Sequence, residues 1–242
     1  MTILALETSA TLAGVALVRD GARLAEREFP ARMTLNQRLA GEVLALLGGD
    51  VGAAGLGAIA VGIGPGSFTG VRMGVALAKA LAHALALPLI GVSGPQAIVA
   101  GLSAPAGTAV CVLQPARADE VYVTTLEAGE GGAPVECAPT QVLTLPRALR
   151  TAEEQLGRAP DVVCGGAATA SAQRIRTVFP DARIAGEEHA LPRAAQVARV
   201  AAARIGDAEP TAALTLTPRY GRLSQAEREF GLDLGLRGQG DG

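Results

Sequence analysis

The chain has 242 residues, of which 49% are hydrophobic and 18% charged, and its formal net charge is −2. This composition predicts one or two packed globular domains and excludes a disordered chain. The small net charge argues against general electrostatic attraction to nucleic acid or to anionic membranes.

Cysteines and histidines are too few and too dispersed for a disulfide framework or a zinc site. Cys111, Cys137 and Cys164 are an odd number without a CxxC pair, which indicates buried thiols in a reducing compartment. His83 and His189 form no HxxxH or HExxH pair, so a histidine-based zinc site is not expected.

No part of the sequence indicates export or membrane insertion. The amino-terminal run lacks a basic region and is interrupted by Glu7, so no signal peptide is expected. The apolar stretch 71–92 contains too many polar residues for a membrane span. We therefore expect a cytoplasmic protein without membrane contact.

The first hundred residues predict the order βββ-α-β-α-β-α. Apolar runs between turn residues indicate strands over 2–6, 14–18, 23–29, 56–63 and 89–92. A capping-box pattern, Thr34-x-x-Gln37, predicts a helix that ends at the glycine pair 48–49. Further helices are predicted over 71–86 and from the pattern Ser93-x-x-Gln96.

A similar order follows in the second half of the chain. Strands are predicted over 108–114, 120–126, 161–165 and 183–185, a loose loop over 129–139, and helices over 146–156, 170–179 and 193–205. Two such units predict a duplicated α/β fold with a cleft between its lobes. We place the lobes at residues 1–104 and 105–222 and a disordered tail at 223–242.

A glycine-rich segment joins the strand 56–63 to the helix 71–86, and we call it the signature loop. Its residues are Gly64, Pro65, Gly66, Ser67, Phe68, Thr69 and Gly70. Strand, glycine loop and helix in this order bring free backbone N–H groups to a positive helix end. The loop lacks the lysine of a Walker motif and the third glycine of a dinucleotide motif. It is either a ligand loop or a tight connection, and Ser67 and Thr69 could bind a phosphate or cap the helix.

The element order and two segments resemble a known family. A duplicated βββαβαβα unit with an acidic residue closing its first strand is the plan of the actin, Hsp70 and sugar-kinase superfamily. Within it, the run from Ile3 to Ser9 together with the stretch from Gly64 to Gly74 looks like the bacterial TsaB family. The likeness covers most of residues 1–222. It implies a two-lobed, actin-like (ribonuclease H-like) α/β fold with mixed sheets flanked by helices.

This resemblance also implies a function in tRNA modification. TsaB proteins are non-catalytic partners of TsaD, which transfers a threonylcarbamoyl group to the tRNA adenosine beside the anticodon, and the ATPase TsaE joins the complex. We therefore expect no enzyme activity or cofactor of this chain alone, with ATP and metal on the partner subunits. The tRNA would be contacted only through the complex, and a homodimer is one alternative for the free protein.

The resemblance implies at most a vestigial nucleotide site. The matching positions are Glu7, Thr8, Ser9, Gly165 and Gly166. A superfamily kinase would need an acidic residue opposite Glu7 to hold Mg²⁺, and Pro115 stands at that position. We expect Glu7 to be a strand-end acid that accepts hydrogen bonds from neighbouring amides. A nucleotide-dependent phosphotransferase is the alternative function, whereas the two isolated histidines oppose a metallopeptidase.

The helix after the signature loop has a wide apolar arc. At 100° per residue, Gly70, Gly74, Leu77 and Leu81 share a face beside the one that would pack on the sheet. Either the neighbouring helix or a helix of a partner protein could cover this second face. Because the family has a TsaD partner, we expect the partner. The predicted interface consists of Gly70, Gly74, Leu77, Leu81, Leu35 and Leu39. Leu35 also stands where family members often have a histidine.

Overall fold

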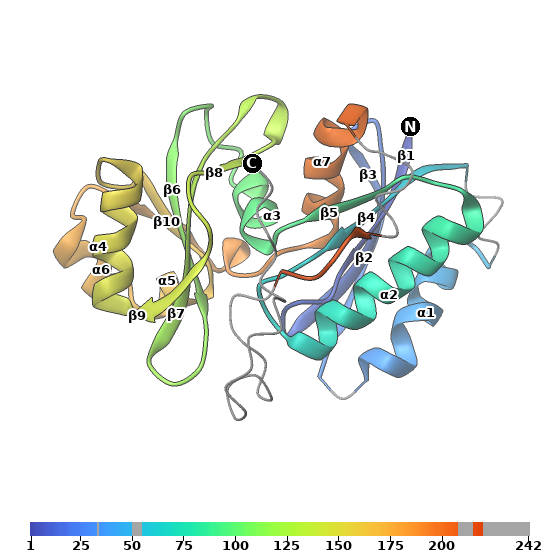
Figure 1. Ribbon diagram of the computed structural model, residues 1–242, viewed down its shortest axis with the longest axis horizontal. Coiled ribbons are helices and arrows are strands. Elements are labelled where there is room, and N and C mark those ends of the chain that lie inside the picture. The colour runs from blue at the N-terminus through green and yellow to red at the C-terminus, as the bar shows by residue number, and fades with distance from the viewer. Residues whose placement is uncertain (33, 50–54, 208–214, 220–242) are drawn as a thin grey trace.

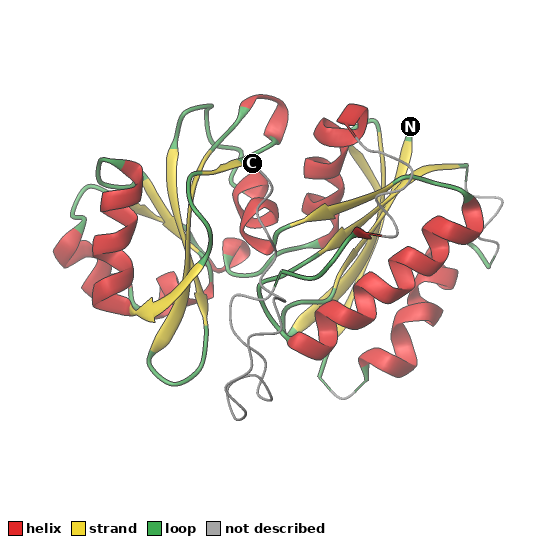
Figure 2. Cartoon of the chain, viewed as in Figure 1, coloured by secondary structure: helices red, strands yellow, loops and turns green. Residues whose placement is uncertain are grey.

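A computed structural model of the chain describes residues 1–32, 34–49, 55–207 and 215–219. The chain forms two lobes that lie side by side (Figure 1). Each lobe contains one mixed sheet with helices on both faces (Figure 2). This architecture confirms the predicted fold class.

The first lobe is built on a five-stranded sheet in the order β3-β2-β1-β4-β5. Its strands are β1 Thr2–Glu7, β2 Leu12–Arg19, β3 Ala22–Pro30, β4 Leu56–Gly62 and β5 Leu89–Val92. The central strand β1 runs antiparallel to β2 and parallel to β4. All of its residues are buried, which explains why residues 3–6, between Thr2 and the final glutamate, are all apolar.

Two helices, α1 (Leu35–Leu46) and α2 (Phe68–Leu85), cover one face of this sheet (Figure 1). Leu39 and Val43 of α1 and Val71 and Val75 of α2 share one core cluster with sheet residues such as Leu4. Their spacing of three to four residues is the helical period that the sequence shows.

The second lobe repeats this plan. Its sheet has the order β11-β10-β6-β7-β8, and β9 also pairs with β7. The strands are β6 Ala109–Pro115, β7 Glu120–Glu127, β8 Val135–Glu136, β9 Gln141–Thr144, β10 Val162–Cys164 and β11 Arg183–Ile184. Helices α4 (Leu145–Leu156), α5 (Gly166–Ala170) and α6 (Ala172–Val178) contribute to the cluster on one face. Numbered within each lobe, the first sheet has the strand order 3-2-1-4-5 and the second has 3-2-1-5-6, with β9 as the additional fourth strand. The two orders agree once β9 is set aside, as a duplication predicts.

The last helix of each lobe packs against the sheet of the other lobe. Helix α7 (Ala194–Arg204) follows the second sheet in sequence but packs on the first, beside Ile3 and Ala5. Helix α3 (Gly94–Gly101) follows the first sheet and inserts Ile98 and Val99 into the core of the second. The two helices also contact each other, so the junction between the lobes is a packed helix pair (Figure 1).

Several local expectations are corrected by the structure. The loop expected over 129–139 contains the short strand β8, and β9 was not predicted. The helix expected over 170–179 begins earlier and is interrupted at Ser171. Thr34 does not cap α1, because its hydroxyl donates to the Pro30 carbonyl at 2.9 Å. The second capping box is confirmed, since Ser93 accepts from the Gln96 amide and the Gln96 side chain accepts from the Ser93 amide.

The cysteines only partly match the expectation of buried thiols. Cys111 and Cys164 are buried, whereas Cys137 is exposed, and all three are free. Burial raises the pKa of the Cys111 thiol to about 12, so this group is neutral at physiological pH. Cys111 and Cys164 belong to clusters on opposite faces of the second sheet.

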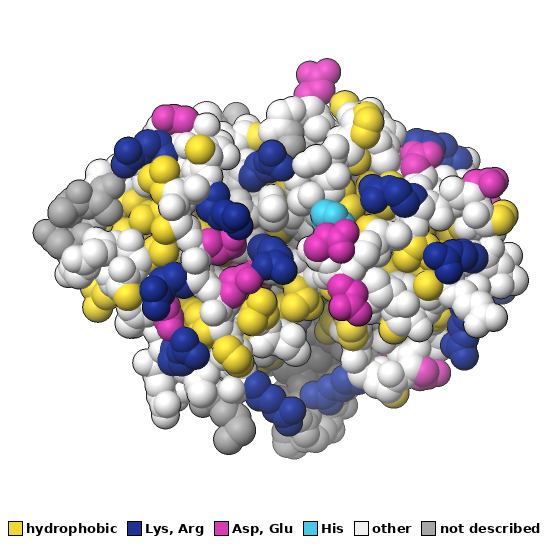
Figure 3. Space-filling view, turned by 180° about the vertical axis from the view of Figure 1, so that it is seen from behind, with side chains coloured by type: hydrophobic (Ala, Val, Ile, Leu, Met, Phe, Trp, Pro, Cys, Tyr) yellow, Lys and Arg dark blue, Asp and Glu magenta, His cyan; other side chains and the backbone are white. Residues whose placement is uncertain are grey.

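Among the described helices, none is long and apolar enough to cross a membrane. Charged side chains of both signs are interspersed with hydrophobic ones on the face shown in Figure 3. The lobe boundaries remain predictions, and the predicted disordered tail lies outside the described residues.

Candidate functional site

The signature loop lies where the carboxyl ends of β1 and β4 meet. These strands are parallel neighbours, so the loops that follow them lie at the same edge of the sheet. The amide of Ser67 donates to the Ser9 carbonyl at 2.7 Å, and the Gly94 amide at the start of α3 donates to the Gly64 carbonyl at 2.8 Å. The loop therefore connects the carboxyl ends of β1 and β4 with the start of α3 between the lobes.

Ser67 is the amino-terminal cap of α2. Its side chain accepts a hydrogen bond from the Gly70 amide at 3.2 Å, which satisfies one of the free amides of the first turn. The structure thus favours capping over phosphate binding for Ser67. The peptide bond between Gly64 and Pro65 is cis.

Three glycines of this region pack directly against the segment after β1. A Cβ atom at Gly66 would lie 2.2 Å from the Ser9 carbonyl oxygen, one at Gly70 2.2 Å from the Thr8 carbonyl oxygen, and one at Gly74 2.2 Å from Thr8 Oγ1. The Thr8 hydroxyl also donates to the Gly70 carbonyl at 2.8 Å. Gly66 and Gly70 are required because the backbone of Thr8 and Ser9 comes too close for any side chain, and Gly74 leaves room for the Thr8 hydroxyl.

The structure places most residues of the predicted partner interface inside the first lobe, and the interface itself stays a prediction. Gly70 and Gly74 are buried against Thr8 and offer no surface to a second protein. Leu35 and Leu39 are only 6% and 3% exposed and belong to the first lobe's core. Leu77 and Leu81 are half-buried against the same core, and Thr8 covers the glycines on this face. Whether Leu77 and Leu81 also reach a partner stays a prediction.

Glu7 is a fully buried carboxyl at the end of β1. One oxygen, Oε1, accepts a hydrogen bond from the Ser9 amide at 2.6 Å, whereas Oε2 has no partner among the described residues. Oε2 lies 2.0 Å from the position that a Cβ atom at Gly62 would take, so only glycine fits there. Desolvation raises the pKa of Glu7, although the hydrogen bonds from Ser9 and Thr8 oppose this shift.

Two more buried polar side chains lie near the signature loop. Ser9 Oγ and Gln114 Oε1 have no hydrogen-bond partner among the described residues. The Gln114 amide lies 3.7 Å from the position of a Cβ atom at Gly94, which itself bonds the loop at Gly64. Glu7 Oε2, Ser9 Oγ and Gln114 Oε1 are therefore oxygen atoms that could coordinate a cation or accept a hydrogen bond from a ligand. Within the described ranges, no group of three or more His, Cys, Asp or Glu side chains could hold a metal.

We expect Glu7→Gln to remove a pH dependence of stability. Because the folded state raises the Glu7 pKa above its ordinary value of 4.5, the folded chain binds more protons than the unfolded chain above about pH 4.5. Stability from this group is complete below that pH and declines as pH rises through the folded pKa, with a slope of up to about 1.4 kcal/mol per pH unit. Urea unfolding at a series of pH values should show a flatter profile for the variant.

Glu153→Gln is the matched control, because Glu153 is exposed on α4 and should leave the profile unchanged. If the stability of Glu7→Gln declines with rising pH as steeply as that of the native chain, another group causes the pH dependence.

The second lobe's loop, at Gly165 and Gly166, is also tightly packed. Gly165 has φ +95°, and a Cβ atom there would lie 2.4 Å from the Leu113 carbonyl oxygen. The ring of Pro115 lies 3.4 Å from the Cβ position of Gly166, so the proline borders this loop. A pocket of about 340 Å³ opens beside it, lined by Gly166, Thr169, Glu187, Ala190, Leu191 and Arg193. Nucleotide contact by Gly165 and Gly166 stays a prediction.

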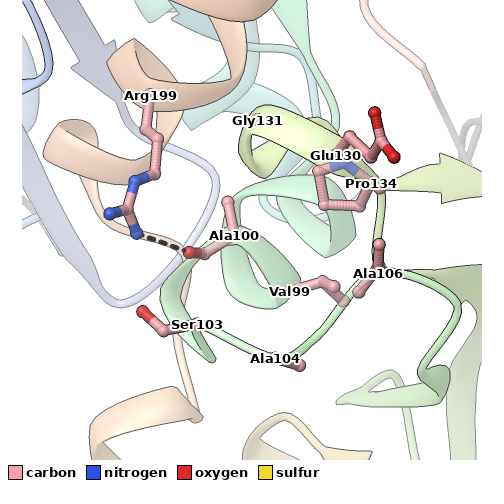
Figure 4. A pocket seen from close by; sticks show the side chains of 11 residues that line it. Val99, Ala100, Ser103, Ala104, Ala106, Glu130, Gly131, Pro134 and Arg199 are labelled. Atoms are coloured by element: carbon pink, nitrogen blue, oxygen red, sulfur yellow. Dashed lines mark hydrogen bonds between the residues drawn. The ribbon is translucent and has the colours of Figure 1, made fainter.

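A pocket that the sequence does not indicate lies at the end of α3 (Figure 4). Its volume is about 320 Å³, and its walls are mainly small side chains of α3, the loop 103–106 and the turn 128–134. Arg199 of α7 borders it and donates to the Ala100 carbonyl at 3.0 Å. Alanines and glycines line this space, and such residues carry no sequence pattern that distinguishes a pocket from ordinary packing.

Comparison with known proteins gives a consistent family. The family model described as "TsaD: tRNA N6-adenosine threonylcarbamoyltransferase" matches residues 37–229, most of the chain. The tRNA threonylcarbamoyladenosine biosynthesis protein TsaB of Bacillus subtilis is 39% identical over 101 residues, which are 41% of this chain and 44% of that protein. The TsaB protein of Escherichia coli is 36% identical over 133 residues, 54% of this chain and 58% of that protein. These matches span about half the length of the curated relatives.

A solved structure extends the likeness to the whole fold. The crystal structure of an uncharacterized protein from Pseudomonas aeruginosa, with similarity to peptidase YEAZ, has a TM-score of 0.70 and 28% identity. It covers 91% of this chain and 99% of its own. A family model that matches most of the chain, and relatives named TsaB, lead to one conclusion: the chain belongs to the TsaB family, within the group that the TsaD-type model describes.

Proposed function

We propose that this chain is a partner subunit of a TsaD-type transferase in the formation of threonylcarbamoyladenosine on tRNA, and that it does not itself catalyse the transfer. The names of the relatives and of the family model support the pathway. In this proposal TsaE joins the same complex, and ATP and metal are bound by the partner subunits. The tRNA is contacted through the complex.

The main support for a non-catalytic role is that the signature loop packs against, and hydrogen-bonds to, other parts of the same chain. Its serine caps α2, its glycines receive the backbone of Thr8 and Ser9, and Gly64 binds the start of α3. A loop that cradles a phosphate must instead keep its amides directed at the ligand. The Glu7 carboxylate is buried against Gly62, and Pro115 borders the opposite loop. These features support a scaffold over the phosphotransferase alternative.

The exposed side of the α1–α2 pair is the surface we assign to the partner. We call it the outer face, and it consists of Gln37, Ala40, Gly41, Leu44, Thr69, Ala76 and Ala80. Leu44 is 44% exposed although it is a large hydrophobic residue. None of these seven residues is charged, and most of their side chains are small, so a helix of the TsaD homologue could approach closely and bury an apolar core.

Depletion of this protein in its host tests the function. We expect the threonylcarbamoyladenosine content of bulk tRNA to fall, as measured by nucleoside mass spectrometry, and to recover when the chain is expressed again. In parallel, the purified chain alone should hydrolyse ATP no faster than background. An unchanged nucleoside level after confirmed depletion would contradict the assignment, and ATP turnover that Glu7→Ala removes would favour the phosphotransferase.

A further inference from the structure

Residues 215–219 lie across the carboxyl end of the first lobe's sheet, where they are drawn in red in front of β4 (Figure 1). The backbone amide of Arg219 donates to the Ile63 carbonyl at 2.8 Å, immediately before the signature loop. Leu216 packs against the core cluster that contains Ile63 and Val71. This segment therefore contacts the first lobe through both its backbone and an apolar side chain.

Two glycines make room for the segment. A Cβ atom at Gly64 would lie 2.9 Å from the Arg219 carbonyl oxygen, and one at Gly91 of β5 would lie 2.5 Å from Leu216 Cδ1. Both distances are shorter than van der Waals contact. Residues 215–219 thus pack closely against the sheet at Gly64 and Gly91, and glycine is needed at both positions to admit this segment.

The side chain of Arg219 reaches the second lobe. Its Nη1 lies 2.9 Å from Oε2 of Glu136 in β8, which pairs with β7. The other oxygen of Glu136 accepts a hydrogen bond from the hydroxyl of Ser93, the cap of α3. Glu136 is only 17% exposed, so both partners hold it at the junction between the lobes.

We propose that residues 215–219 form a clasp that fastens the two lobes together and keeps the signature loop in place. Leu216 and the Arg219 backbone anchor the clasp on the first lobe, and the Arg219 side chain closes it on Glu136. While the clasp is closed, the lobes cannot separate at β8, and Ile63 cannot move away from the segment. The inference concerns the conformation of this chain and does not depend on the proposed function.

Amide hydrogen exchange followed by mass spectrometry tests the clasp in the full chain. In Arg219→Ala, we expect exchange to become about two- to fivefold faster in both 61–66 and 134–138, the range expected for loss of a partly exposed ion pair. Leu216→Ala should also make amide exchange faster in the same two regions, although the Leu216 side chain forms no ion pair. Arg174→Ala, an exposed arginine on α6 without an ion pair among the described residues, should change neither region.

The double variant decides whether the segment acts as one unit. If either substitution opens the same clasp, the combined variant should exchange little faster than the faster single variant, because a clasp that is already open cannot be opened again. Fully additive effects of the two substitutions would overturn the proposal. Faster exchange in Arg219→Ala that is confined to 134–138 would overturn it too, because Arg219 would then form only a local surface ion pair. Unchanged exchange in both single variants would overturn it as well.

Discussion

Gly70→Ala should destabilise the isolated chain by roughly 2–3 kcal/mol or more and lower its Tm by about 4–12 °C. The added methyl group would lie 2.2 Å from the Thr8 carbonyl oxygen, which is a backbone atom and cannot rotate away. Helix α2 cannot shift freely either, because the Thr8 hydroxyl bonds the Gly70 carbonyl and the Ser67 amide bonds Ser9. Thermal and urea unfolding of the purified variant measure this effect.

Gly41→Ala is the matched control, since it makes the same change within a helix. No described residue outside the helix's own turns lies within 4 Å of a Cβ atom at Gly41, so the variant should be more stable by about 0.5–1 kcal/mol through helix propensity alone. Opposite signs for the two variants would establish that packing, rather than propensity, sets the cost at Gly70. If Gly70→Ala instead melts at or above the native temperature, the glycine face of α2 is free and could accept a partner helix after all.

The long elements could be predicted from the sequence because burial leaves a periodic pattern. The β1 strand is buried throughout and reads as an apolar run, and α1 shows the helical spacing of Leu35, Leu39 and Val43. The duplication follows from the order of these elements. Strands β8 and β9 could not be predicted in the same way. They are two and four residues long, and they exist because β7 offers them a pairing edge, which is a tertiary effect.

The sequence predicts which residues of the signature loop and of α2 share a side, but not which segments of the chain contact that side. Helical periodicity correctly places Gly70, Gly74, Leu77 and Leu81 on one side of α2. It does not say what covers that side, because Thr8 lies 62 residues before Gly70 in the chain. Similarly, nothing near Glu136 in the sequence indicates that its carboxylate binds Ser93 and Arg219 from distant segments. Sequence patterns identify faces, whereas the neighbours of a face depend on long-range contacts.

Ala80→Glu should weaken binding to the TsaD homologue by about two to four orders of magnitude while leaving the chain folded. Ala80 is exposed in the outer face of α2, so a glutamate there is solvated in the free protein. In the proposed complex, the carboxylate would be buried without a partner, which costs about 3–5 kcal/mol, or roughly two to four decades of affinity. Calorimetric titration of the variant with the TsaD homologue gives the affinity, and thermal unfolding of each chain alone checks the fold.

The same substitution on the opposite side of the first lobe separates an interface effect from a general effect of charge. Ala203 is exposed near the end of α7, and α7 covers the other face of the first sheet. Ala203→Glu should therefore bind like the native chain. A selective loss with Ala80→Glu would place the partner on the α1–α2 pair, where Leu44 adds the largest exposed apolar side chain of α1. Equal binding by both variants would move the interface elsewhere, because no helix could pack over the outer face and leave a charge at its centre without cost.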